Sequence, residues 1–256
     1  MPAKSFAGTD LPVRSDLAEA HERAWKAIAA PGSWLTGERR VAVAAEIRRA
    51  RDCSHCARIK AALSPNAVQG AHESLGVLEA AEVELIHRVV CDPGRLSESW
   101  SQSVLARGLA EAEYVEIVGL IAMVMVMDTC TRALGLPERA LPAPLGGEPI
   151  RYRPPGARKQ AAWLPLVEPE DVVEADGPMY PGPKVGYIHR GLSLVPQSLR
   201  DYWALANCHY LSSRYISQID KSIRAISQFD KSIRAISRPQ MELLAARVSA
   251  MHQCVY

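Results

Sequence analysis

One apolar segment, residues 111–134, constrains the fold more than any other part of the sequence. Its residues follow helical spacing, and Gly135 and Pro137 follow it as stop signals. Its most apolar run, residues 117–127, is shorter than the about 20 residues that a membrane-spanning helix needs. The segment therefore predicts a helix buried in the core of a folded chain.

Helical spacing also recurs on both sides of this segment. No run alternates apolar and polar residues as a half-buried strand does, and a composition rich in Ala, Leu, Ile, Val and Arg favours helices. The sequence therefore predicts an all-α chain. The further predicted helices cover residues 16–29, 36–63 (with an interruption near Cys53), 79–90, 97–107 and 192–209.

Residues 137–186 differ from the rest of the chain. Eleven of the 18 prolines and six of the 16 glycines fall there, and the helical periodicity is lost. Such a composition is typical of a connector laid over the surface. It predicts a first helical unit over residues 1–136, a linker over 137–186 and a second helical unit over 187–256.

A short internal repeat follows in the second half. Residues 217–226 and 227–236 agree at nine of ten positions, which indicates a tandem duplication. A second helical copy would turn the following face by about 80°, so we expect one copy to be looped out or the helix to be broken nearby. Ser237 and Gln240 then form a capping-box pair, with Pro239 in the first turn of a new helix.

Cys53 and Cys56 have the spacing of a redox-active pair. At a helix start, the unpaired N–H groups stabilise the first thiolate, and the second sulfur is one turn away. His55 between them is able to move a proton near neutral pH. The alternatives are an ordinary buried pair or part of a zinc site.

A zinc site needs four ligands, and residues 53–56 supply at most two usable ones. No second cysteine pair follows. The other histidines have no ligand-like spacing, so the sequence assigns no metal and no cofactor. These are His21, His72, His87, His189 and His209.

A second candidate site lies at the C-terminal end. Glu242 precedes Cys254 by twelve residues. On one straight helix the two would lie about 18 Å apart and on different faces. A carboxylate can therefore serve the sulfur of Cys254 only if the chain turns back near residues 249–253.

The two cysteine-containing segments resemble the motif of one known family. Glu242 and Cys254 match the first two positions of Glu-x11-Cys-x-x-Cys-x3-His, and the chain resembles the alkyl hydroperoxidase D-like / carboxymuconolactone decarboxylase-like family. Cys53, His55 and Cys56 match its Cys-x-His-Cys segment. The resemblance covers most of the chain and implies two tandem AhpD-like helical units, the second incomplete at the C-terminus. Further similar stretches are residues 92–97, 112–119, 192–196 and 238–254.

The chain also departs from the family pattern. Val41 stands where the first unit should have its glutamate, and Lys60 stands where it should have its histidine. Glu46 could substitute for the glutamate, although at a different spacing. In the second unit the chain stops at Tyr256, where the next position should be the second cysteine. We therefore expect weak activity or none from this form. A selenocysteine codon read as a stop would explain the ending, and the alternatives are a nonsense mutation and a sequence that was cut short.

The resemblance implies a thiol-dependent peroxidase that reduces alkyl hydroperoxides. The expected catalytic residues are Cys254, Glu242, Cys53, Cys56 and His55. A thiol or dithiol reductant is expected to regenerate the enzyme, and the chain is expected to form a homo-oligomer. The alternatives are a catalytically degenerate helical scaffold and a decarboxylase-type lyase. A net charge of +2 with interspersed signs argues against nucleic-acid binding, and the sequence predicts a cytoplasmic protein without a membrane partner or signal peptide.

Overall fold

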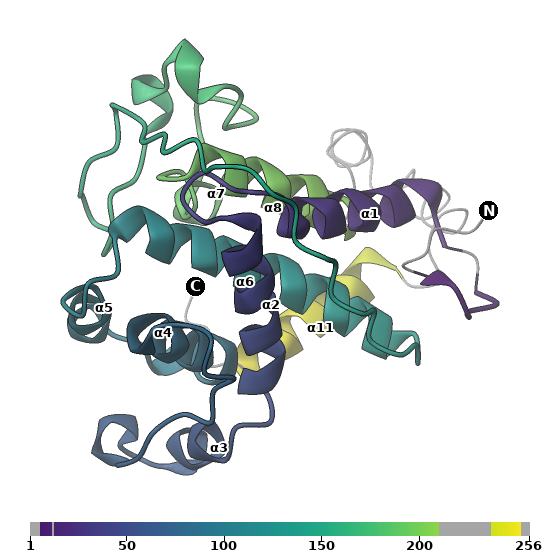
Figure 1. The fold of residues 1–256 in the computed structure, drawn as a ribbon. Helices are drawn as coiled ribbons and strands as arrows, with labels where there is room; N and C mark the ends of the chain where they lie inside the picture. The colour runs from purple at the N-terminus through teal and green to yellow at the C-terminus, as the bar shows by residue number, and fades with distance from the viewer. Residues whose placement is uncertain (1–5, 12, 210–236, 252–256) are drawn as a thin grey trace.

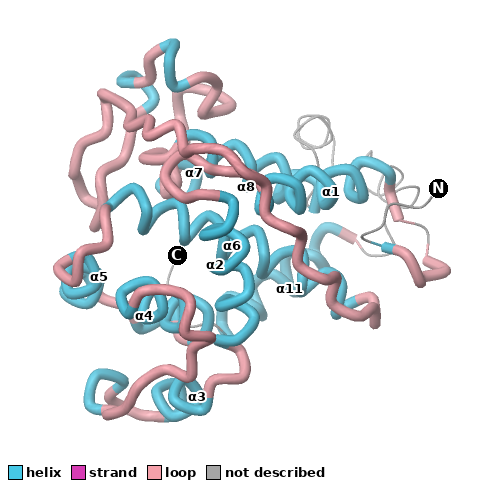
Figure 2. Tube along the Cα trace, viewed as in Figure 1, coloured by secondary structure: helices cyan, strands magenta, loops and turns pink. Residues whose placement is uncertain are grey.

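The long apolar segment forms helix α6, which runs through the middle of the molecule (Figure 1). The structure is a computed structural model and describes residues 6–11, 13–209 and 237–251. Within these ranges the chain is helical and forms no strand, apart from one isolated antiparallel bridge between Arg158 and Leu166 (Figure 2). The prediction of an all-α fold is confirmed.

The α-helices that the structure describes fall close to the predicted ranges, except for the four-residue helix Tyr187–Arg190, which was not predicted. They are α1 (Ser15–Ala29), α2 (Gly37–Ala50), α3 (Ser54–Ala61), α4 (Ala80–Cys91), α5 (Glu98–Leu105), α6 (Glu111–Ala133), α7 (Tyr187–Arg190), α8 (Pro196–His209) and α11 (Arg238–Met251). Short 3₁₀ turns lie at Pro65–Ala67, Pro93–Arg95, Pro169–Asp171 and Glu174–Asp176.

Helix α6 is a core helix. By length and composition it could cross a membrane, but 67% of its most apolar window is buried inside the fold. Ile117, Met123 and Val124 have no exposed surface and pack in the main core with residues of α1, α2, α4 and α5. A buried helix of a folded core therefore accounts for the apolar run.

The predicted interruption near Cys53 is confirmed. Helix α2 ends at Ala50, and α3 begins at Ser54 with Cys53 in the extended N-cap position. Figure 1 shows α3 beside α4 at the bottom of the view. This break places the two cysteines at the start of a separate helix.

Residues 137–186 run as an extended connection over the helices. Val167 and Met179 of this segment are nevertheless buried, in a second core cluster that also contains Ala112, Val115 and Leu194. The division into two units stays a prediction, and the repeat at residues 217–236 lies outside the described residues. The Ser237–Gln240 pair is present, since the Ser237 N–H donates to Gln240 Oε1 at 2.8 Å.

Two histidines join α1 to α8. The Nε2 atoms of His21 and His209 are 2.8 Å apart, so one ring donates to the lone pair of the other. Burial and the neighbouring His209 lower the pKa of His21 to about 4, and burial also lowers the pKa of His209. The contact therefore requires that at least one of the two rings stays neutral.

Acid is expected to weaken the α1–α8 contact. Because the folded-state pKa of His21 is depressed, the unfolded chain takes up this proton near pH 6.5 and the folded chain only near pH 4. Stability is therefore lost as the pH falls through this window. Between pH 7 and pH 5 we expect wild type to lose about 1–2 kcal/mol more unfolding free energy than His21→Gln. Urea unfolding at both pH values measures this, and equal losses would contradict the prediction.

Candidate functional site

The two sulfurs of the Cys53-x-x-Cys56 pair lie at the start of α3. Both cysteines are free thiols, and each is only 2% exposed. Cys53 Sγ accepts a hydrogen bond from the Glu73 N–H at 3.4 Å. Cys56, one helical turn further, directs its sulfur toward α4. The pair therefore consists of two adjacent reduced thiols that are shielded from solvent.

A histidine–carboxylate pair from α4 and α2 faces Cys56. His87 Nδ1 lies 3.2 Å from Cys56 Sγ, and His87 Nε2 lies 2.8 Å from Glu46 Oε1. The second oxygen of Glu46 accepts the Leu75 N–H at 3.0 Å. Because a carboxylate is only an acceptor, His87 carries its hydrogen on Nε2 and turns the lone pair of Nδ1 toward the sulfur.

A second histidine–carboxylate pair, His72 and Glu84, also faces the two sulfurs. His72, on the irregular segment between α3 and α4, places Nδ1 3.3 Å from Cys56 Sγ and 3.9 Å from Cys53 Sγ. Its Nε2 lies 3.1 Å from Glu84 Oε2, and the other Glu84 oxygen accepts from Trp100 Nε1 at 2.8 Å. Each of the two histidines is thus oriented by its own carboxylate.

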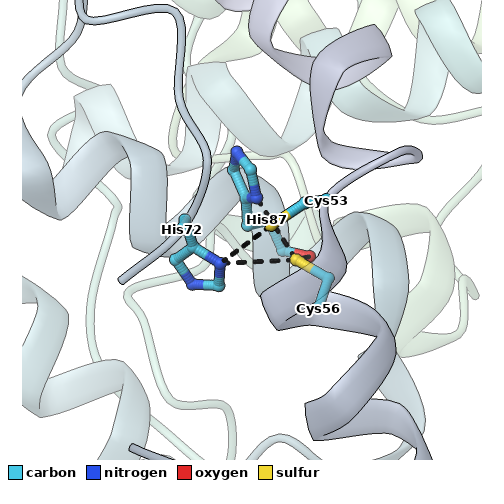
Figure 3. Close-up of side chains that lie close together, drawn as sticks. All are labelled: Cys53, Cys56, His72 and His87. Atoms are coloured by element: carbon cyan, nitrogen blue, oxygen red, sulfur yellow. Dashed lines mark hydrogen bonds between the residues drawn. The ribbon is translucent and has the colours of Figure 1, made fainter. Parts of the chain in front are cut away.

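Figure 3 shows the resulting arrangement, in which the two sulfurs and the two rings converge on one small volume. The four atoms, Cys53 Sγ, Cys56 Sγ, His72 Nδ1 and His87 Nδ1, all lie within 4.8 Å of one another. Thiol and imidazole groups in this arrangement are able to exchange protons or to share a metal ion.

The surroundings separate the properties of the two thiols. Burial raises the pKa of Cys53, but the N–H groups of Glu73 and Cys56, together with His72, more than offset this and bring the pKa to about 7. Contact with the Cys91 thiol, burial and the nearby Cys53 raise the pKa of Cys56.

The two rings also differ. Burial lowers the pKa of His87, although its carboxylate partner Glu46 acts to raise it. The lowered pKa keeps the ring neutral. Burial also acts to lower the pKa of His72, but the hydrogen bonds with Glu84 and Cys53 outweigh it and the pKa is raised. His72 is thus the more basic of the two rings, whereas His87 stays neutral and keeps the lone pair of its Nδ1 free.

The structure brings only some of the residues expected from the sequence together. Cys53 and Cys56 form the centre. His55 is buried beside them, with its ring edge-on to His72 at 5.0 Å between centroids and its Nδ1 3.1 Å from Arg58 Nη2. Among the residues that the structure describes, His55 makes no hydrogen bond to either sulfur.

Of the two C-terminal candidates, the structure describes only Glu242. Glu242 lies exposed on α11, which is unbroken up to Met251. Cys254 lies outside the described residues, so the predicted turn that would bring it to Glu242 stays a prediction.

Sequence reasoning missed His72 and His87. His87 has a local signal, since it stands four residues after Val83 and four before Cys91 on the apolar face of α4. Glu46 has a similar one, three residues after Val43 and four before Ala50 on the buried face of α2. A charged or titratable residue on a core-facing stripe requires a buried partner. His72 has no such signal, because it lies in an irregular segment.

One cavity reaches the neighbourhood of the sulfurs. It has a volume of about 120 Å³ and is lined by Cys91 together with Lys60, Arg95 and Met251, among others. The Cys91 thiol contacts Cys56. A larger cavity of about 560 Å³ between α2 and α4 has no cysteine or histidine in its lining.

No family model, curated protein or solved structure matches this chain. The resemblance to the AhpD-like family therefore rests on the sequence motifs alone.

Proposed function

We propose that this chain is a thiol-dependent peroxidase that reduces small alkyl hydroperoxides through Cys53 and Cys56. The observation that carries the proposal is the hydrogen-bonded chain Glu46–His87–Cys56 beside a second thiol, because it couples a base oriented by a carboxylate to a dithiol. The proposal includes a thiol or dithiol reductant and a cytoplasmic setting.

In the first step the Cys53 thiolate attacks the terminal oxygen of the hydroperoxide. The S–O bond forms, the O–O bond breaks and the alkoxide leaves. His72, 3.9 Å from this sulfur and held by Glu84, takes the proton of the Cys53 thiol and passes it to the alkoxide. The products are an alcohol and a sulfenic acid on Cys53.

In the second step Cys56 resolves the sulfenic acid. His87 Nδ1 takes the Cys56 proton, the freed thiolate attacks the Cys53 sulfur, and hydroxide leaves with the proton from His87 as water. The balance is one hydroperoxide and two thiols to one alcohol, one water and one disulfide. An external dithiol then returns both cysteines to the reduced state.

The burial of both sulfurs restricts the substrate. With each cysteine 2% exposed, a bulky hydroperoxide cannot reach Cys53 without displacing neighbours such as His72 and Glu73, which contact its sulfur. The cavity of about 120 Å³ beside Cys91, whose thiol contacts Cys56, is the route that we propose for a small one. This favours short-chain alkyl hydroperoxides over lipid hydroperoxides.

A single-turnover experiment tests this function. Reduced full-length protein, kept metal-free by a chelator, receives one equivalent of tert-butyl hydroperoxide. We expect one equivalent of alcohol, the loss of two thiols and a Cys53–Cys56 disulfide in the mass spectrum. Cys56→Ser should stop at a sulfenic acid on Cys53 that dimedone traps, and Cys53→Ser should not react.

Cys208→Ser is the matched control, because Cys208 is half-buried on α8 and its thiol only donates to the Ala204 carbonyl at 3.4 Å. This variant should behave as wild type. If wild type consumes no hydroperoxide, or if the Cys53→Ser/Cys56→Ser double variant consumes it equally fast, the chain is not this peroxidase, and the scaffold alternative gains.

A further inference from the structure

The four atoms that converge in Figure 3 also form a complete ligand set for a metal ion. Two sulfurs and two imidazole nitrogens lie within 4.8 Å of one another, and Cys53, Cys56, His72 and His87 each contribute one. They come from three places in the fold: the start of α3, the irregular segment before α4, and α4 itself. The spacing of the cysteines alone therefore gives no sign of this set.

The distances fit a tetrahedral zinc ion. With zinc bonds of about 2.3 Å to sulfur and about 2.0 Å to nitrogen, neighbouring sulfur and nitrogen ligands lie about 3.6 Å apart. The sulfur–nitrogen distances here are 3.9 Å for Cys53–His72, 3.3 Å for Cys56–His72 and 3.2 Å for Cys56–His87. Small side-chain adjustments are enough to reach the ideal geometry.

The hydrogen-bond partners of the two histidines also fit a zinc site. A histidine that binds zinc usually donates its other ring N–H to a carboxylate, which fixes the tautomer and raises the basicity of the ligating nitrogen. Both histidines do this here, His87 to Glu46 at 2.8 Å and His72 to Glu84 at 3.1 Å. In each ring it is Nδ1 that faces the sulfurs.

We propose that the reduced chain binds one zinc ion through Cys53, Cys56, His72 and His87. Sulfur and imidazole ligands select zinc over magnesium or calcium, which prefer oxygen. Two thiolates balance the charge of the ion, so that the buried centre is neutral. Four protein ligands leave no open position, which is typical of a structural site. The ion would join α3 and the irregular segment before α4 to α4 itself.

This inference does not rest on the proposed peroxidase. Zinc and a disulfide use the same sulfur electron pairs, so the two states exclude each other. Metal binding is measured without hydroperoxide, and the peroxidase assay is run with a chelator. If the chain binds no metal, the peroxidase assay can still be interpreted, and if it reduces no hydroperoxide, the metal titration can still be interpreted.

Metal titration of the reduced, metal-free full chain tests the site. Cobalt(II) serves as the spectroscopic probe, and zinc affinity is measured by competition with a chromophoric chelator. We expect one cobalt per chain, the visible bands of tetrahedral cobalt, a thiolate-to-cobalt charge-transfer band and displacement by one equivalent of zinc. Cys56→Ser and His72→Ala should weaken zinc binding by more than the about 10–100-fold that loss of an outer-shell partner costs.

His72→Ala is included in case Cys56→Ser fails to fold. Because His72 lies in an irregular segment rather than in a core helix, we expect its replacement to disturb the fold less. Cys208→Ser is the matched control and should bind as wild type does. In addition, zinc should raise the melting temperature of wild type and leave that of His72→Ala unchanged. The proposal is overturned if folded, reduced wild type binds no cobalt stoichiometrically, or if Cys56→Ser and His72→Ala both bind with wild-type affinity.

Discussion

Replacing Glu46 by glutamine is expected to slow disulfide formation between Cys53 and Cys56 by about 10²–10⁴-fold, the range that positioned acid–base catalysis contributes. Glu46 accepts two hydrogen bonds, one from the backbone N–H of Leu75 and one from Nε2 of His87. Glutamine has only one acceptor oxygen. The Leu75 N–H cannot reverse its polarity, so the amide oxygen pairs with it and the amide NH₂ faces His87.

The imidazole ring of His87 must then change its tautomer. Nε2 becomes the acceptor, and the hydrogen moves to Nδ1, which lies 3.2 Å from Cys56 Sγ. A protonated Nδ1 cannot take the Cys56 proton. In addition, a neutral amide does not stabilise the imidazolium that would form in the transfer. Glu46 thus acts as a positioning residue for His87.

Two readouts separate this effect from a general structural one. The rate of thiol loss after a hydroperoxide pulse gives the kinetic effect, and nitrogen chemical shifts of labelled His87 give the tautomer directly. Glu38→Gln is the matched control, because Glu38 is exposed in the first turn of the same helix. A Glu46→Gln variant with a reversed tautomer and an unchanged rate would rule out the relay.

The fold was largely predictable because it follows from local patterns. The apolar stripe of α6 and the stop signals Gly135 and Pro137 define the helix to within a residue at its C-terminal end. The break that places Cys53 at a helix start was also predicted. Each of these features is set by residues within a few turns of one another, and periodicity reports such features well.

The site was less predictable because it is assembled by tertiary contacts. His87 and Glu46 are 41 positions apart, and only the packing of α2 against α4 brings them together. His72 is placed by an irregular segment whose path no periodicity encodes. The spacing of Cys53 and Cys56 therefore indicated sulfur chemistry, but the sequence pointed to His55 as the proton carrier, whereas the rings whose nitrogens face the sulfurs are those of His72 and His87.

The largest loss of stability is expected from breaking a buried ion pair at the start of α2. Arg40 Nη1 pairs with Glu116 Oε1, and these side chains are 3% and 0% exposed. Glu116 also accepts the Trp34 N–H at 2.7 Å, and Arg40 donates to the Ala27 carbonyl at 3.1 Å. The pair therefore joins the turn between α1 and α2 to the middle of the fold. Removing one partner leaves a charge buried without compensation.

Glu116→Gln is expected to lower the unfolding free energy by about 3–5 kcal/mol, because the guanidinium of Arg40 then stays buried without a counter-charge. Replacing both residues, as in Arg40→Met/Glu116→Leu, should recover part of this loss, since no charge is then buried, although the Trp34 N–H and the Ala27 carbonyl lose these partners. Denaturant unfolding of the full chain measures each value. Glu98→Gln is the control, because its ion pair with Lys159 is about half-exposed (53% and 52%) and should contribute at most about 1 kcal/mol. If the double variant is as unstable as Glu116→Gln, packing around these side chains, rather than the unpaired charge, determines the loss.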